Sequence, residues 1–202
     1  MFTGLIRECA QTLSYQDNIL WLGAQYRPNI GDSVAVNGAC LTVIEVNQGS
    51  FKAELSHESR KVLAVENYKG LVHIEPAMTL ESRIEGHLLQ GHIDAIGEIT
   101  KIQKDENGTD FFIKTNKETM KFLSPKGSVA IDGVSLTVGE IKDDIFKLTI
   151  IPHTIKQTLF SSYKVGRRVN IETDMMARYL FNLLKKDEGL KWSDIDRMTA
   201  LY

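Results

Sequence analysis

Short apolar runs, rich in β-branched residues, follow one another along the first 75 residues of the chain. Examples are residues 19–22 (Ile-Leu-Trp-Leu), 33–36 (Ser-Val-Ala-Val), 41–44 and 51–55. Clusters of Gly, Asn and Asp separate these runs at short intervals, as at residues 29–32. Short strands with turn signals between them are typical of a small barrel or sandwich. The first half of the chain is therefore predicted to be all-β.

The pattern changes to that of an amphipathic helix after Asp174. Apolar residues recur there at intervals of three and four, as one stripe requires: Met176, Tyr179, Leu180, Leu183 and Leu184. Asp174 suits the N-cap, and Lys185-Lys186 followed by Gly189 suits the end of the helix. The stripe must be covered either by its own chain or by the same helix of other subunits, and both remain open. Residues 190–202 suggest a second short helix.

One ten-residue stretch occurs twice, at residues 34–43 and again at 129–138. Six of the ten positions are identical. Residues 91–93 align in the same way with residues 4–6, so the duplication covers a whole domain. The two copies differ in polar character at Asn37 and Asp132, and at Cys40 and Ser135. A duplicated scaffold that differs at such positions predicts two related pockets with different tasks.

Length and composition agree with two small globular domains. The 202 residues are divided into 1–86, 87–174 and a tail at 175–202. The net charge of -2 gives no sign of binding to nucleic acid or to a membrane surface. The chain has no leader and no apolar stretch long enough to span a membrane, and its two cysteines form no disulfide framework. We expect a soluble, cytoplasmic protein whose Phe2 is tucked in.

The histidines at 87 and 92 are the first candidates for chemistry. No phosphate-binding loop or metal-ligand spacing is present, and as metal ligands these two would lack partners. We interpret His87 as a hydrogen-bonded structural residue. His92 occupies the position of Leu5 in the first half, so the scaffold does not require a histidine there. That comparison favours a functional role for His92.

The two copies of the repeat hold the other candidates. Cys40 and Ser135 each stand two residues before a threonine, Thr42 or Thr137, and so share a strand face with it. A lone strand cysteine is usually inert filler, and Ser135 lacks the Gly-x-Ser-x-Gly elbow of hydrolases. Asp132 lies in a tight turn, where aspartate is common. These residues alone define two related pockets without assigning a reaction.

Five motifs taken together resemble riboflavin synthase of the α-chain type. They appear in the family's order over the whole length, together with the duplication and the C-terminal helix: Met1-Phe2-Thr3-Gly4-Leu5-Ile6, Asn37-Gly38-Ala39-Cys40-Leu41-Thr42, Gly86-His87-Leu88-Leu89-Gln90-Gly91-His92, Ile131-Asp132-Gly133-Val134-Ser135-Leu136-Thr137 and Ile151-Pro152-His153-Thr154.

The resemblance implies two tandem six-stranded antiparallel Greek-key barrels, each binding one 6,7-dimethyl-8-ribityllumazine. The C-terminal helix would join three chains, with each active site between the N-terminal barrel of one chain and the C-terminal barrel of a neighbour. There one lumazine would pass a four-carbon unit to the other, giving riboflavin and 5-amino-6-ribitylamino-2,4(1H,3H)-pyrimidinedione. The family uses no metal and no cofactor, and lumazine synthase is a possible partner.

Carried over by position, the resemblance implies two sets of substrate-binding residues. The first pocket would use Gly4, Leu5, Ile6, Cys40, Leu41, Thr42, Glu54, Leu55, Ser56, His57, Glu58 and Ser59. The second would use Gly91, His92, Ile93, Lys126, Ser135, Leu136, Thr137, Ile150, Ile151, Pro152, His153, Thr154 and Ile155. The two sets coincide under the internal alignment.

The resemblance also implies residues for turnover: Phe2, Ser33, Cys40, His92, Asp132 and Ser135. His92 and Ser135 are the preferred pair for proton transfer, or for activating the water or hydroxyl that adds at C7 of the lumazine. Asp132 would orient them, and Asp174 is a weaker candidate.

Two readings compete with an enzyme. Lumazine-binding antenna proteins share the duplicated fold, but are expected to lose the second pocket and the trimer, whereas this chain keeps Asp132, Ser135, His92 and the helix stripe. A generic β-barrel interaction module would explain neither the duplicated polar positions nor the apolar N-terminus.

Overall fold

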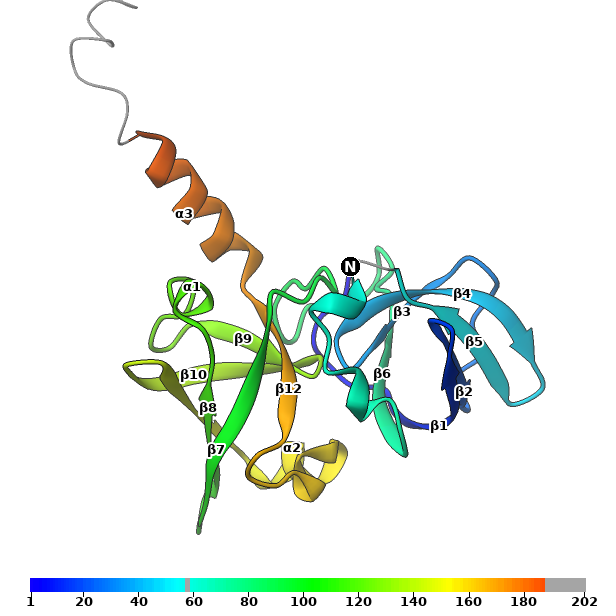
Figure 1. Cartoon of the computed structure of the whole chain (residues 1–202), viewed down its shortest axis with the longest axis horizontal. Helices are drawn as coiled ribbons and strands as arrows, with labels where there is room; N and C mark the ends of the chain where they lie inside the picture. Colours follow the sequence, from blue (N-terminus) through cyan, green and yellow to red (C-terminus); the bar gives the residue numbers. More distant parts are fainter. Residues whose placement is uncertain (57–58, 188–202) are drawn as a thin grey trace, which may run out of the picture.

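The computed structural model describes residues 1–56 and 59–187 and folds them mainly into two closed antiparallel barrels (Figure 1). The first barrel holds β1 (Glu8–Gln16), β2 (Ile19–Gly23), β3 (Ser33–Val36), β4 (Ala39–Asn47), β5 (Ser50–Glu54) and β6 (Leu71–Pro76). The second holds β7 (Ala95–Asp105), β8 (Gly108–Lys114), β9 (Ser128–Ile131), β10 (Val134–Lys142), β11 (Ile145–Ile150) and β12 (Arg168–Thr173).

Both barrels have the same strand order. In the first, hydrogen-bonded neighbours follow β1-β2-β5-β4-β3-β6, and the second repeats this order from β7 to β12. β3, β4 and β5 are consecutive hairpins, and β6 returns to lie beside β3, which is the Greek-key arrangement. The predicted pair of six-stranded Greek-key barrels is confirmed.

Short helices lie in the connections, and one longer helix follows the last strand. Three 3₁₀ turns cover Ser59–Lys61, Val65–Asn67 and Leu159–Ser162, and two short α-helices are α1 (Lys117–Met120) and α2 (Pro152–Gln157). The longer helix is α3 (Met175–Asp187).

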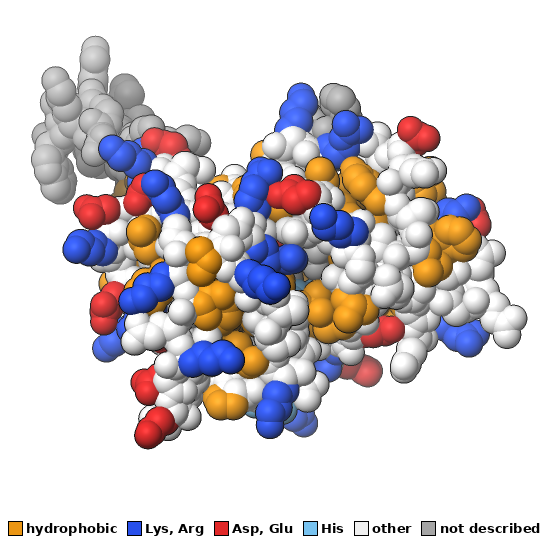
Figure 2. Space-filling view, turned by 60° about the horizontal axis from the view of Figure 1, so that its bottom comes forward, with side chains coloured by type: hydrophobic (Ala, Val, Ile, Leu, Met, Phe, Trp, Pro, Cys, Tyr) orange, Lys and Arg blue, Asp and Glu red, His pale blue; other side chains and the backbone are white. Residues whose placement is uncertain are grey.

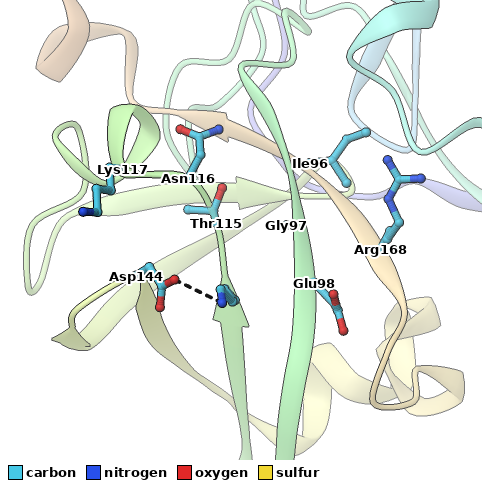
Figure 3. A pocket seen from close by; sticks show the side chains of 9 residues that line it. Ile96, Gly97, Glu98, Thr115, Asn116, Lys117, Asp144 and Arg168 are labelled. Carbon is cyan, nitrogen blue, oxygen red and sulfur yellow. Dashed lines mark ion pairs between the residues drawn. The ribbon is translucent and has the colours of Figure 1, made fainter.

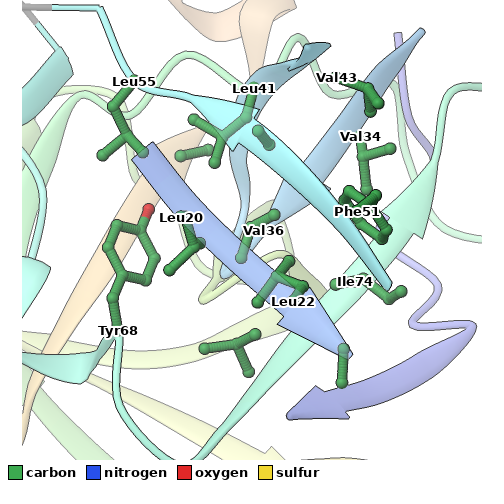
Figure 4. Close-up of a cluster of buried hydrophobic side chains, with 14 of the residues drawn as sticks. Leu20, Leu22, Val34, Val36, Leu41, Val43, Phe51, Leu55, Tyr68 and Ile74 are labelled. Carbon is green, nitrogen blue, oxygen red and sulfur yellow. The ribbon is translucent and has the colours of Figure 1, made fainter. Parts of the chain in front are cut away.

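Each barrel encloses its own core, because alternate strand residues point inward. Leu20, Leu22, Val36, Phe51 and Ile74 are fully buried in the first barrel (Figure 4). The second barrel is filled in the same way by residues that include Phe111, Ile113, Ile131, Phe146 and Ile171. A third, smaller cluster lies between the barrels and contains Phe2, Ala35, Leu89 and Ala130.

The tight turns of the two repeats meet where the barrels join. A Cβ on Gly38 would lie 2.7 Å from the backbone nitrogen of Gly133, and one on Gly133 would lie 2.8 Å from that of Gly38. Both glycines also have positive φ, +83° and +82°. The close approach and the left-handed backbone both require glycine here, so the repeated sequence builds an internal pseudo-twofold axis.

Next to this axis, His73 of the first barrel makes the same pair of backbone hydrogen bonds as Asn170 of the second barrel. His73 Nδ1 lies 2.9 Å from the carbonyl oxygen of Asp132, and the N–H of Leu159 donates to His73 Nε2 at 2.8 Å. On the other side Asn170 makes the equivalent pair, donating to a backbone carbonyl and accepting from a backbone N–H, each at 2.8 Å. These partners assign a neutral imidazole with its proton on Nδ1.

We expect His73→Asn to fold normally and to change the pH dependence of stability. Burial lowers the pKa of His73 to about 4, against the opposing hydrogen bond to Asp132. As pH falls from 6.5 to 4, the unfolded chain gains a proton at this residue before the folded chain does. The free energy of unfolding of the wild type should therefore fall by about 3 kcal/mol, and that of the variant should not show this loss. Urea unfolding of both proteins at pH 7, 5.5 and 4 measures how the difference between their free energies of unfolding changes with pH. Parallel stability profiles would contradict it, and His73→Leu, which loses both hydrogen bonds, serves as the control.

Helix α3 contacts its own chain with one face only. Phe181 packs edge-on against Phe122, with ring centroids 5.3 Å apart, and Arg178 binds side chains near the base of the helix. The predicted apolar stripe lies on the other side, with Met176, Tyr179, Leu180, Leu183 and Leu184 between 49% and 68% exposed. Residues 1–56 and 59–187 therefore leave the stripe uncovered, against the alternative that this part of the chain covers it. Beyond its first turns the helix projects away from both barrels (Figure 1).

Other features of the helix and surface agree with the sequence. Asp174 Oδ1 accepts the N–H of Met176 at 2.8 Å, which confirms the predicted cap. Gly189 and the expected helix at 190–202 lie outside the described residues. Within the described chain no helix is long and apolar enough to cross a membrane. Acidic and basic side chains alternate over the face in Figure 2, as the nearly balanced charge predicts.

Candidate functional site

The two segments that begin with the duplicated glycines are exchanged between the barrels. Phe2 and Leu89 form a two-way backbone bridge, N–H to carbonyl oxygen, at 2.8 and 3.0 Å. From this bridge each segment runs to the other barrel: the N–H of Ser135 donates to the Gly4 carbonyl, and that of Cys40 donates to the Gly91 carbonyl, both at 2.9 Å. The expected grouping of residues 4–6 with the first pocket and 91–93 with the second is therefore wrong.

Packing confirms the exchange. Ile6 lies against the core of the second barrel, whereas Ile93 lies against the core of the first. A Cβ on Gly4 would come within 2.5 Å of the Cβ of Ser135, and one on Gly91 would come equally close to that of Cys40. Only glycine permits these approaches. The internal alignment could not reveal this, because it pairs Gly4 with Gly91 whichever barrel each one joins.

Two buried glutamates hold the exchanged segments in place. Glu75 accepts the N–H groups of Thr3 and Gly4 at 2.7 and 3.0 Å. Glu172 accepts those of Gln90 and Gly91 at the same two distances. Burial raises the pKa of both carboxyls, that of Glu172 to about 7, and the backbone donors oppose the rise. The two glutamates therefore hold the backbone of the two exchanged segments in the same way.

The first pocket is an open cavity of about 490 Å³ on the first barrel. Its wall combines the repeat on β4, the end of β5 and the exchanged segment of the second half. The lining residues are Ala39, Cys40, Thr42, Glu54, Ser56, Val62, Leu63, Gly91, His92 and Ile93. The volume lies in the range of small-molecule sites, and His92, Thr42 and Glu54 remain exposed in it.

The second pocket that the repeat predicts would be the corresponding surface of the second barrel, where Gly4 lies against Ser135. Here the linker residues Gly86 and His87 pack over the serine, and a Cβ on Gly86 would lie 2.8 Å from that of Ser135. His87 Nδ1 is 2.7 Å from Ser135 Oγ. Burial lowers the pKa of His87, against the opposing charge of Asp174. The neutral imidazole can therefore accept the hydroxyl proton of Ser135.

His87 also has an unsatisfied atom. Its Nε2 is buried and has no hydrogen-bond partner among the described residues. Buried polar atoms are rarely left without a partner, so this nitrogen is suited to a water or a ligand atom. Our interpretation of His87 as a merely structural residue is therefore incomplete. The signal that could have identified it is its position outside the repeat: Gly91 aligns with Gly4, which leaves His87 without a counterpart in the first half.

The preferred pair of His92 and Ser135 is not brought together within one chain. His92 lines the first pocket, whereas Ser135 binds His87 at the second. The two segments leave the Phe2–Leu89 bridge for different barrels, Gly4 for the backbone of Ser135 and Gly91 for that of Cys40.

Asp132 does not orient either residue. It is fully buried, and its carboxylate accepts the Tyr163 hydroxyl at 2.6 Å and the Asn170 N–H at 2.8 Å. Burial raises its pKa to about 6, and the hydrogen bond from Tyr163 opposes the rise. The orienting role that we expected is wrong, since both oxygens brace the junction of the barrels. Asn37 does the same on the other side, accepting the N–H of His73 at 2.9 Å.

Phe2 and Ser33 occupy different environments. Phe2 is 1% exposed in the cluster between the barrels, so its side chain holds the exchanged segment rather than facing a ligand; this corrects its place among the residues expected in turnover. Its predicted burial is confirmed. Ser33 lies directly opposite Thr42 on the neighbouring strand, hence on the same sheet face as that pocket residue.

The remaining expected residues are distributed over both barrels. Leu41 and Leu55 are buried core residues of the first barrel, and Ile150 is buried in the second. His57 and Glu58 lie outside the described residues, and Ser59 begins the 3₁₀ turn that follows. The last positions lie at the start of α2 and in the first half of β10: Ile151, Pro152, His153, Thr154, Ile155, Leu136 and Thr137.

Lys126 stands apart in an exposed turn ahead of β9. Its backbone N–H donates to the Val138 carbonyl at 2.8 Å, and its φ is +67°. The equivalent position of the first half is Gly31, also with positive φ. The lysine keeps a backbone conformation that favours glycine, so its side chain is held at the rim of the repeat on β10.

A second cavity, of about 440 Å³, lies away from these pockets on the outer wall of the second barrel (Figure 3). It spans β12, β7 and the end of β8, and Lys114 pairs with Asp144 across it at 3.2 Å. None of its lining residues belongs to the repeated stretch or the exchanged segments. Over residues 1–56 and 59–187, no group of three His, Cys, Asp or Glu side chains could hold a metal ion.

Comparison with known proteins follows from this geometry. The model of the lumazine binding domain matches residues 3–77 and again 90–174. The chain is 44% identical over 161 residues to riboflavin synthase of Photobacterium phosphoreum, covering 79% of this chain and 74% of that protein. It is 35% identical over 195 residues to riboflavin synthase of Bacillus subtilis (strain 168), covering 92% and 91%.

Solved structures show the same fold. LumP in complex with 6,7-dimethyl-8-(1'-D-ribityl) lumazine superposes with a TM-score of 0.73 at 21% identity, covering 86% of this chain and 99% of that one. The barrels, their exchanged segments and the two matches define a protein built from a tandem pair of lumazine-binding domains. The chain belongs to the riboflavin synthase family.

Proposed function

We propose that this protein is a riboflavin synthase, which converts two molecules of 6,7-dimethyl-8-ribityllumazine into riboflavin and 5-amino-6-ribitylamino-2,4(1H,3H)-pyrimidinedione. The observation that carries the proposal is that the two barrels place different polar groups at equivalent positions of the repeat. The first barrel presents Cys40, Thr42 and His92 in a cavity, and the second places Ser135 against His87. A reaction between two copies of one substrate requires two such places with unequal tasks.

The chemistry makes modest demands on the protein. C7 of the lumazine is electrophilic, and the methyl group attached to it is acidic because the ring delocalises the carbanion. Holding two rings face to face supplies several kcal/mol as effective molarity. The residues then need only to move protons. In the second pocket His87 would accept a proton from Ser135, or from a water beside it, as oxygen adds to C7.

Two chains would contribute to each site. The first pocket of one chain lies on one barrel, and Ser135 lies on the other. The first pocket of one chain would therefore close over the second pocket of a neighbour, which brings His92 and Ser135 together. The exposed stripe of α3 would hold three chains in this arrangement. In this proposal residues 1–86 and 87–174 each bind one lumazine, and 175–202 assemble the chains.

The expected surroundings complete the proposal. The substrate of a soluble pathway and two cysteines without a disulfide suit the cytoplasm. Lumazine synthase, which would supply the substrate, remains a proposed partner.

The proposal is tested by incubating the pure protein with 6,7-dimethyl-8-ribityllumazine and following absorbance. Riboflavin should appear at half the molar amount of lumazine consumed, with no added metal or cofactor. Tight binding with shifted fluorescence and no turnover would identify an antenna protein instead, and the ligand site would then be the first pocket alone.

A further inference from the structure

The clamp at the first pocket has a component that its twin lacks. Glu75 and Glu172 each hold two backbone N–H groups of an exchanged segment. At Glu172 an arginine from α3 is added: Arg178 Nη2 lies 3.8 Å from Glu172 and donates to the Gln90 side-chain oxygen at 2.8 Å. The duplicated scaffold does not require this arginine, since residues 3–4 are held by Glu75 through hydrogen bonds alone.

Arg178 also binds the far end of the same segment. It forms an ion pair and hydrogen bond with Asp94 Oδ1. Asp94 Oδ2 accepts both the N–H and the hydroxyl of Thr173 at 2.7 Å. The guanidinium therefore bridges Gln90 and Asp94, the residues on either side of Gly91-His92-Ile93. Those three residues form one wall of the first pocket.

The charges at this point depend on the arginine. Glu172 is 1% exposed and Arg178 only 15% exposed, so their interaction is weakly screened by water. Asp94 and Glu172 are both acidic, and the charge of Asp94 raises the pKa of Glu172 while Arg178 lowers it. Without Arg178 two carboxylates would face each other beside a backbone loop that depends on one of them being charged.

We propose that Arg178 is a positioning residue of the first pocket: it ties helix α3 to Gln90, Asp94 and Glu172 and so fixes Gly91-His92-Ile93 for binding one of the two lumazines. This inference rests on the proposed function and adds a coupling to it. The helix that presents the exposed stripe also sets a wall of the substrate site, and it does so for the first pocket and not the second.

The test compares Arg178→Met, Arg178→Lys and the control Arg168→Met, whose arginine is half exposed and pairs with Glu66 at 3.1 Å outside both pockets. Fluorescence titration with 6,7-dimethyl-8-ribityllumazine should show that Arg178→Met weakens one of two binding events by about tenfold, a usual size for coupling between sites. The second event should stay unchanged. Arg178→Lys keeps the charge and should recover part of the affinity, and Arg168→Met should match the wild type.

The pH profile separates positioning from general damage. Loss of Arg178 raises the pKa of Glu172 further, so the weakened event should weaken more as pH falls from 9 to 6.5 and recover towards high pH. Equal weakening of both events, or none, would overturn the inference, whatever the oligomeric state in sedimentation. If Arg178→Met does not fold, Asp94→Asn removes the ion pair at constant volume and should give the same selective loss. A wild type that binds no lumazine would refute the proposed function itself. A wild type that binds lumazine normally, with an Arg178→Met variant of the same affinity, would refute only the positioning role of Arg178.

Discussion

Glutamate at both Leu180 and Leu183 should separate the chains and lower turnover by about 100-fold or more, because the reacting rings would lose their shared site. The two leucines are 56% and 61% exposed on a helix face that the chain itself leaves uncovered. Their substitution touches neither barrel, and Arg178 on the opposite face keeps its partners. Sedimentation velocity should show monomers, and each monomer should still bind lumazine.

The matched control for this change is Asn182→Glu, which places the same charge on the same helix at an exposed position outside the stripe. It should remain assembled and active. A double glutamate variant that is monomeric and fully active would show that each chain holds a complete site.

Ser135→Ala should lower turnover by about 100- to 1,000-fold while lumazine binding stays within a few fold, since proton transfer by a positioned group is worth that much. The substitution removes the hydroxyl that lies 2.7 Å from His87 Nδ1 and leaves the backbone N–H of residue 135 bonded to Gly4. Single-turnover absorbance measurements and fluorescence titration separate the two effects.

A second serine of the same barrel provides the control for that experiment. Ser162 is exposed and donates its hydroxyl to the Leu159 carbonyl at 2.8 Å, away from the pocket. Ser162→Ala should leave turnover unchanged. Normal turnover of Ser135→Ala would remove Ser135 from the mechanism and leave His87 with a water as its only proton donor.

The apolar runs and turn residues were enough to predict a duplicated all-β barrel or sandwich, because local alternation agrees with the tertiary structure. The six strands and the Greek-key order came from the family resemblance. Asp132 was predicted to lie in a tight turn, although the packing of Gly133 against Gly38 across the axis has no local signal. The helix cap at Asp174 and the apolar stripe of α3 follow from sequence spacing alone. What covers that stripe does not follow from the spacing.

The site was harder to predict because it depends on long-range contacts. The exchange of Gly4 and Gly91 between barrels is invisible to an alignment that treats them as equivalent. It separates His92 from Ser135 and gives Ser135 the partner His87 instead. Asp132 was expected to take part in turnover, and it differs from its counterpart Asn37. In the structure its carboxylate instead accepts the hydroxyl of Tyr163 at the junction of the barrels.

The most direct measurement of the central claim, that one site is built from the first pocket of one chain and the second pocket of another, is complementation between two inactive variants. His92→Ala and Ser135→Ala are co-expressed with different tags, and the mixed oligomers are purified through both tags and assayed for riboflavin. Each mixed cyclic trimer that carries both tags has about one site in three that combines two intact pockets. Mixed oligomers should therefore recover about a third of wild-type turnover if each variant alone is inactive. Mixed oligomers no more active than either variant alone would contradict the shared site. His92 and Ser135 would then have to act within one chain.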